Sequence, residues 1–200
     1  GGGALSVLVA GGAVWRIHDQ GVFSIGEGAA YAPWKNWRTE TGAGPLELVR
    51  AAILAANPHN TQPWLFKVTE KQIELFADTG RNLGSLDPYL REMHLGLGCA
   101  VENMVLAASA NGYEAGVTLS DGTLSPIPDT PGPCLVARLE LSPGRTERGS
   151  LYEAIPQRHT NRGRFNRDRP MPPELLGKMR RIAEDDPDMN VFLYTAEEEK

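Results

Sequence analysis

The amino-acid sequence predicts an α+β fold. Segments with helical periodicity alternate with short apolar runs typical of strands, and two of those runs are spaced as a hairpin. The chain of 200 residues is 41% hydrophobic and 22% charged, which is typical of a soluble globular protein. A formal net charge of −5 argues against a nucleic-acid-binding protein, since neutralising phosphates requires a basic surface.

The first 16 residues form an uncharged, glycine-rich apolar run that ends at Arg16. It is shorter than the roughly 20 apolar residues of a membrane span. It fits the apolar core of an export signal or membrane anchor without its basic start, whereas a buried helix would not need five glycines. We therefore expect a membrane-anchored or exported protein, and a cytoplasmic one if the run is not a signal. Residues 17–44 are expected to form an extended arm held by Trp34 and Trp37.

The next segment predicts a helix followed by a hairpin. Apolar side chains recur at helical spacing over residues 45–56, and the helix is expected to end before Pro58. Two short apolar runs at 64–68 and 73–77 then flank a polar turn, which is the pattern of a β-hairpin.

A long central helix is predicted from Asp87 to Asn111. Asp87 is a good N-cap with Pro88 in the first turn, and the pair Asn111-Gly112 is a C-terminal signal. Strands are expected at 115–119 and 135–141, after which the Pro143-Gly144 pair predicts a boundary.

Beyond that boundary the sequence predicts four short segments. Ser150 and Glu153 have the spacing of a capping box for a short helix. An Arg-rich loop follows at 158–168, then a helix from Pro172 to about Glu184, and a strand at 190–195.

The two cysteines, Cys99 and Cys134, are isolated in sequence. Neither has a Cys or His neighbour at metal-ligand spacing, so we expect no metal site and no disulfide framework. Both are interpreted as buried core thiols, because Cys99 lies in an apolar helical stretch and Cys134 opens a predicted strand.

Three side chains in the Arg-rich loop alternate: Arg158, Thr160 and Arg162. In an extended chain they project to one side. Two guanidinium groups and a hydroxyl on one face can bind a phosphate dianion through charge-assisted hydrogen bonds. Taken alone, the same pattern also fits an ordinary solvated loop.

The segment between the first helix and the hairpin is rich in amides and prolines. Asn60 and Gln62 offer both donors and acceptors, which suits the edge of a flat heteroaromatic ring. Pro58 and Pro63 restrict the backbone around them. The alternative is a turn in which Asn60 caps the backbone and Trp64 packs in the core.

These two segments resemble motifs of one enzyme family. Asn60-x-Gln62-Pro63-Trp64 is similar to the N-x-Q-P-W motif of the FMN-dependent nitroreductases. The run from Arg158 through His159, Thr160 and Arg162 to Phe165 is similar to their phosphate-binding R-x-S-x-R/K-x-x-F motif. The helix over 87–111 resembles their central dimer-interface helix, so the resemblance covers about residues 45–195 and implies a three-layer nitroreductase-like α+β fold.

The order of the two motifs is the reverse of that in ordinary members. In those members each FMN lies between two subunits, and a chain with two halves in tandem would reproduce that arrangement. The sequence in this respect resembles the Acg-like tandem subfamily, many of whose members begin with an export signal. The resemblance implies a first half at 45–142 and the start of a second half at 145–200, forming a tandem pseudo-dimer or a homodimer.

The resemblance implies a set of FMN-binding residues. Arg158, Thr160 and Arg162 would hold the phosphate with His159 beside them. A second group would contact the flavin or fix its loop, namely Asn57, Asn60 and Gln62. Ordinary members carry Pro-Ser where this chain has Ala56-Asn57, which leaves the role of Asn57 open.

The function implied is electron transfer from NAD(P)H through FMN to a small acceptor such as a nitroaromatic compound or a quinone. We expect no catalytic side chain, because the flavin carries the chemistry. Two alternatives remain: a protein that sequesters FMN without turnover, and a membrane-tethered interaction domain without flavin whose Arg-rich loop binds an anionic partner.

Overall fold

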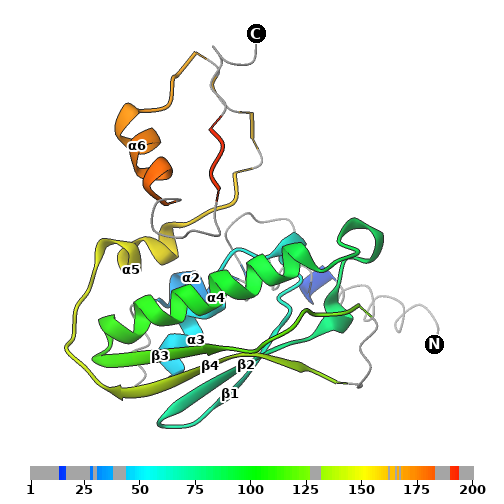
Figure 1. Ribbon diagram of the computed structural model, residues 1–200, viewed down its shortest axis with the longest axis vertical. Helices are drawn as coiled ribbons and strands as arrows, with labels where there is room; N and C mark the ends of the chain where they lie inside the picture. Colours follow the sequence, from blue (N-terminus) through cyan, green and yellow to red (C-terminus); the bar gives the residue numbers. More distant parts are fainter. Residues whose placement is uncertain are drawn as a thin grey trace. The chain divides into compact units, whose positions relative to one another are not determined.

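The computed structural model describes residues 14–16, 28, 31–37, 44–126, 132–161, 163–164, 166, 168–182 and 190–193. The chain divides into two compact units, residues 1–160 and 161–200. The first unit combines one antiparallel sheet with helices, so the predicted α+β class is confirmed (Figure 1).

The sheet has four strands in the order β1-β2-β4-β3, and every neighbouring pair is antiparallel. Their bounds are Trp64–Val68 for β1, Gln72–Ala77 for β2, Tyr113–Leu119 for β3 and Cys134–Pro143 for β4. The hairpin predicted at 64–77 is present, with Trp64 paired to Ala77. The strand patterns were readable in the sequence because alternate residues of β2 and β4 face the core.

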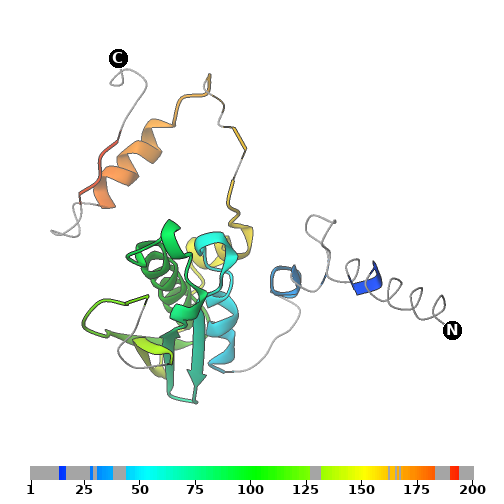
Figure 2. The same cartoon turned by 90° about the vertical axis from the view of Figure 1, so that its right-hand side faces the viewer.

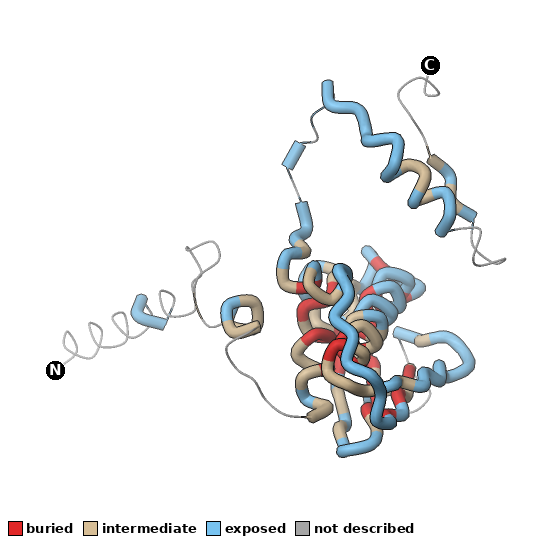
Figure 3. Tube along the Cα trace, turned by 90° about the vertical axis from the view of Figure 1, so that its left-hand side faces the viewer, coloured by how far each residue is buried: buried red, intermediate tan, exposed pale blue. Residues whose placement is uncertain are grey.

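Two helices pack together on one face of the sheet: α3 (Leu46–Ala52) and α4 (Arg91–Ala110). Figures 1 and 2 show α4 running across the sheet with α3 beside it. Their small residues allow close packing, and the buried side chains of both helices join those of β2 and β4 in one core. Figure 3 shows these buried residues gathered where the helices meet the sheet.

Both helices are shorter than the sequence predicted. α3 ends at Ala52 rather than near residue 56. α4 begins at Arg91 rather than Asp87, because Leu90 has a left-handed backbone (φ 53°) that interrupts the helix. Asp87 still caps a backbone N–H in the first turn of α4 although it lies before the helix, since its Oδ2 accepts a hydrogen bond from the Met93 N–H at 3.1 Å. The predicted end at Asn111 is correct.

The chain after Gly144 continues to pack on the first unit. The Glu147 N–H donates to the Ser109 carbonyl at 2.9 Å, and Ile155 is buried in the core. The helix α5 (Ser150–Ala154) and the 3-10 turn η5 (Ile155–Gln157) follow. The predicted capping box is wrong, because the N-cap is Gly149 and no side chain caps the helix. That the second half of a tandem begins near residue 145 stays a prediction.

The described part of the N-terminal arm is helical rather than extended. It forms one turn, α2 (Ala32–Lys35), and Trp34 and Trp37 lie half-buried against the core. The ring centroids of Trp37 and Tyr152 are 5.4 Å apart, so this arm also contacts α5.

The second unit contains the helix α6 (Pro173–Ile182). Residues 190–193 form no strand, which corrects the described part of the prediction for 190–195. Most of the predicted signal or anchor, residues 1–13, lies outside the described residues. Among the residues that are described, no helix is long and apolar enough to span a membrane.

Candidate functional site

The amide-rich segment forms a left-handed loop between α3 and β1. Its middle is the 3-10 turn η2 (Pro58–Asn60), and Trp64 behind it is buried in the core. Three of its residues have positive φ: 46° at His59, 56° at Asn60 and 48° at Gln62. None is glycine, so each costs conformational energy that the surroundings must offset. Such clusters of strain are typical of binding sites, which makes this loop the leading candidate.

Hydrogen bonds within the loop fix the amides. Asn57 Oδ1 accepts from the Gln62 N–H at 2.8 Å, while Asn57 Nδ2 donates to the Ala55 carbonyl at 3.3 Å. Asn57, rather than Asn60, is therefore the residue that closes the turn. The side chains of Gln62 and Asn60 are joined by a bond of 3.1 Å from Nε2 to Oδ1. Within the described residues, Asn60 Nδ2 and Gln62 Oε1 have no protein partner.

The loop rests directly on α4. Gly96 is buried in that helix, and a Cβ placed there would lie 3.2 Å from both Asn57 Cβ and Pro58 Cδ. Only glycine permits this approach without displacing the loop. The loop that carries the amides therefore packs directly on α4 at Gly96.

Arg158, the first residue of the Arg-rich motif, contacts the chain just after the C-terminal end of α3. Its Nη2 donates to the Leu54 carbonyl at 3.2 Å, three residues before Asn57, and its Nη1 lies 3.4 Å from Thr160 Oγ1. Its Nε is buried and has no hydrogen-bond partner among the described residues. The predicted alternation therefore holds for Arg158 and Thr160.

The remaining predicted phosphate ligands are placed less fully. His159 and Thr160 are exposed. Arg162 lies outside the described residues. The structure brings Arg158 to the helix end that leads into Asn57, and it records no contact between Arg158 and Asn60 or Gln62.

Arg81, which was not among the predicted site residues, also contacts the loop. Its Nη1 lies 3.2 Å from the Thr61 carbonyl and 3.5 Å from the Gln62 carbonyl. Its Nε donates to Asp78 Oδ2 at 3.2 Å. The Asp-x-x-Arg spacing is common on protein surfaces, so nothing in the sequence singles out Arg81.

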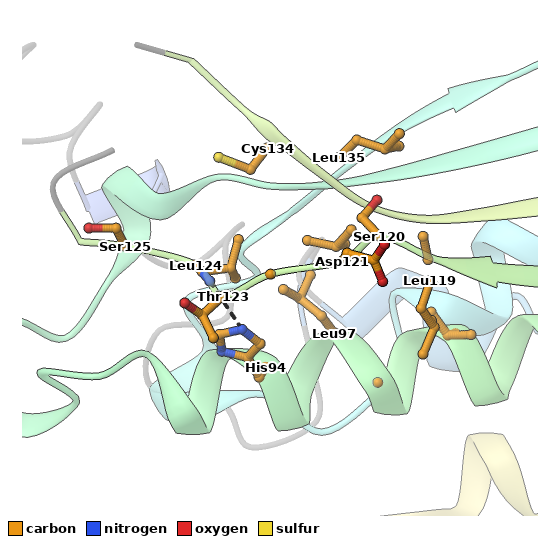
Figure 4. A pocket seen from close by; sticks show the side chains of 15 residues that line it. His94, Leu97, Leu119, Ser120, Asp121, Thr123, Leu124, Ser125, Cys134 and Leu135 are labelled. Atoms are coloured by element: carbon orange, nitrogen blue, oxygen red, sulfur yellow. Dashed lines mark hydrogen bonds between the residues drawn. The ribbon is translucent and has the colours of Figure 1, made fainter. Parts of the chain in front are cut away.

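A separate cavity of about 460 Å³ lies between α4 and the segment that links β3 to β4 (Figure 4). His94 stands at its edge, where Nδ1 contacts the Leu90 carbonyl at 2.6 Å and Nε2 accepts from the Leu124 N–H at 3.3 Å. Because residues two apart on a helix point about 200° away from each other, His94 and Gly96 lie on opposite sides of α4. This cavity is therefore distinct from the amide loop.

Neither cysteine is a fully buried core thiol. Cys99 is exposed on α4, and Cys134 is half-buried at the start of β4. Cys99 was misassigned because the outer side of α4 also carries apolar residues, among them Leu95. Among the described residues, no group of three His, Cys, Asp or Glu side chains is placed to hold a metal ion.

Comparison with known proteins gives similarity to two curated relatives. Both are proteins of Mycobacterium tuberculosis strains with the name "Putative NAD(P)H nitroreductase", and each is 32% identical to this chain over 117 residues. The match covers 58% of the chain and 32% of each relative, so the chain spans about a third of the length of the relatives it matches. No protein-family model matches the chain.

Proposed function

We propose that this chain forms part of an FMN site of nitroreductase type, in which electrons pass from NAD(P)H through the flavin to a small acceptor such as a nitroaromatic compound or a quinone. The observation that carries the proposal is the strained loop from Asn57 to Gln62, which presents fixed amides beside the helix end contacted by Arg158. The name of the two relatives supports the same activity class.

The residues present fit such a flavin. Asn60 Nδ2 and Gln62 Oε1 supply one donor and one acceptor, which matches the mixed edge of an isoalloxazine ring. The Arg158 Nε–H has no partner among the described residues. A phosphate oxygen would give it a charge-assisted hydrogen bond. We propose Thr160, His159 and Arg162 as its neighbours at the phosphate, and Asn57 as the residue that shapes the loop.

FMN would supply the redox chemistry when bound, and the chain would bind and orient it. The proposal needs no acid or base from Asn57, Asn60 or Gln62, whose amides do not titrate. We further propose that a second nitroreductase-like half, or a second copy of the chain, completes the site, because FMN sites of this family lie between two such units.

The first experiment is a visible absorption spectrum of the purified full-length protein after addition of FMN and desalting, followed by anaerobic addition of NADPH or NADH. Retained flavin that bleaches supports the oxidoreductase. Retained flavin that stays oxidised would favour the alternative of FMN sequestration. Absence of retained flavin would contradict the proposal and leave the flavin-free interaction domain.

A matched pair of variants tests the phosphate assignment. Arg158→Ala removes one charge-assisted hydrogen-bonding group, and we expect FMN binding to weaken roughly ten- to a hundredfold. Arg148→Ala removes the same charge from an exposed position in the same segment and should leave the FMN Kd unchanged. Equal effects of the two variants would show that only net charge matters.

A further inference from the structure

The left-handed loop needs an external support, because three strained residues lie within four positions. Each left-handed non-glycine residue is sterically strained, so an unsupported loop would relax. The bond from the Gln62 N–H to Asn57 Oδ1 closes the turn from within. It does not fix the carbonyls of Thr61 and Gln62.

Those carbonyls are held by Arg81. Its Nη1 reaches both, at 3.2 Å for Thr61 and 3.5 Å for Gln62. The planar guanidinium allows Nε to bind the Asp78 carboxylate at the same time, at 3.2 Å. A single side chain thus connects two peptide groups of the loop to a carboxylate.

The carboxylate is itself anchored to the sheet. Asp78 follows β2 directly, and its N–H donates to the Pro63 carbonyl at 2.9 Å. Its Oδ1 accepts from the Gly80 N–H at 3.2 Å, which caps the 3-10 turn η3 (Thr79–Arg81). The support therefore extends from the hydrogen-bonded sheet through Asp78 and Arg81 to the loop.

We propose that Arg81 is a positioning residue for the amide pair Asn60 and Gln62, and that it acts through the Thr61 and Gln62 carbonyls without touching the ligand. This inference rests on the proposed flavin site and goes beyond it, since it assigns the preorganisation of that site to a residue outside both motifs. By holding the peptides, Arg81 keeps the amides aligned before the ring binds, so less ordering is needed on binding.

The binding test uses two ligands, FMN and riboflavin, which share the ring but differ in the phosphate. For Arg81→Ala we expect both dissociation constants to rise by the same factor, roughly three- to thirtyfold, because the support serves the ring site. For Arg158→Ala only the FMN constant should rise. A rise confined to FMN in Arg81→Ala would overturn the proposal, because it would make Arg81 a phosphate ligand.

A conservative variant separates shape from charge. Arg81→Lys keeps the positive charge but cannot bridge two carbonyls and a carboxylate with a planar fork. We expect it to recover at most a small part of the lost riboflavin affinity. Wild-type affinity in Arg81→Lys would contradict the positioning role.

A ligand-free measurement keeps this inference distinct from the proposed function. Amide hydrogen exchange of the full chain should show faster exchange at Thr61 and Gln62 in Arg81→Ala, with unchanged exchange in Arg148→Ala. If the wild type binds no flavin, the proposed function fails while this exchange result still decides whether Arg81 supports the loop. Unchanged exchange in Arg81→Ala would overturn the support itself.

Discussion

At the scale of single residues, Glu74 on the outer face of the sheet is a carboxylate held by two cationic side chains. Its carboxylate accepts two bonds from Arg138, at 2.8 and 3.2 Å, and pairs with Lys67 Nζ at 3.1 Å. The hydrogen bonds from Arg138 and then Lys67 lower the pKa of Glu74 below its ordinary value of 4.5. The three side chains link β1, β2 and β4 across the face away from the helices.

This arrangement predicts a dependence of stability on pH. Because the pKa of Glu74 is lower in the folded than in the unfolded state, its ionised form stabilises the fold above about pH 4.5, and the contribution is lost as pH falls through the folded pKa. Glu74→Gln should lower Tm at neutral pH, and the Tm gap to the wild type should shrink below that value. Thermal unfolding monitored by circular dichroism between pH 3 and 7 measures it.

Glu140→Gln is the matched control. Glu140 lies opposite Gln72 on the same sheet and is exposed. The Tm of Glu140→Gln should differ from that of the wild type by the same amount at every pH. A Tm gap for Glu74→Gln that stays constant down to pH 3 would contradict the role given to its charge.

Residue type alone selected two amides of the candidate site, because Asn60 and Gln62 lie between Pro58 and Pro63 at a strand entrance. Asn57 was selected only through the family resemblance, and the roles of all three residues stay predictions. The left-handed backbone of Asn60 and Gln62 could not be predicted, since φ > 0 is normally signalled by glycine. Arg81 also escaped, because its contact with Thr61 joins residues 20 positions apart and requires the fold.

At the scale of elements, the support of the loop depends on close packing against α4. Gly96 and Gly98 lie in the same helix, yet only Gly96 meets the loop, and nothing lies within 4 Å of a Cβ at Gly98. Substitutions at the two positions therefore distinguish the effect of helix propensity on stability from the effect of the contact with the loop.

A pair of alanine substitutions follows. Gly98→Ala should stabilise the protein by up to about 1 kcal/mol through helix propensity. Gly96→Ala gains the same propensity but presses on Asn57 and Pro58, so it should be less stable than Gly98→Ala by about 1–3 kcal/mol. Urea denaturation of both variants measures the difference. Equal stability of the two would mean that the loop yields freely.

Element types were easier to predict than their ends. β1 was predicted with its observed bounds because a short apolar run beside a polar turn is local information. The predicted start of α4 was wrong. Asp87-Pro88 has the composition of a helix start, but the left-handed backbone of Leu90 moves the start of the helix to Arg91. The strand predicted at 190–195 had β-type residues but no partner strand among the described residues.

At the scale of the whole molecule, the two units of the chain differ in how many buried side chains their described residues contain. The first contains the sheet and the whole hydrophobic core cluster. The second contains α6, none of whose ten residues is buried. The sequence predicted a helix from Pro172 to about Glu184 because Pro172-Pro173-Glu174 is a helix start signal, but a start signal does not reveal whether a face of the helix is covered.

This contrast predicts the pattern of hydrogen exchange in the 200-residue chain. A ten-residue helix without buried side chains has little beyond its own backbone bonds to stabilise it, and isolated helices of that length are marginal in water. We expect amides of α6 to exchange within about tenfold of unstructured rates, while those at Ala100 and Met104 in α4 open only with the global unfolding of the first unit. Exchange detected by mass spectrometry or NMR supplies both values from one sample, so α4 is the internal control. Protection of α6 equal to that of α4 would contradict the expectation, because it would require the apolar side of α6, including Leu175 and Ile182, to be covered in solution.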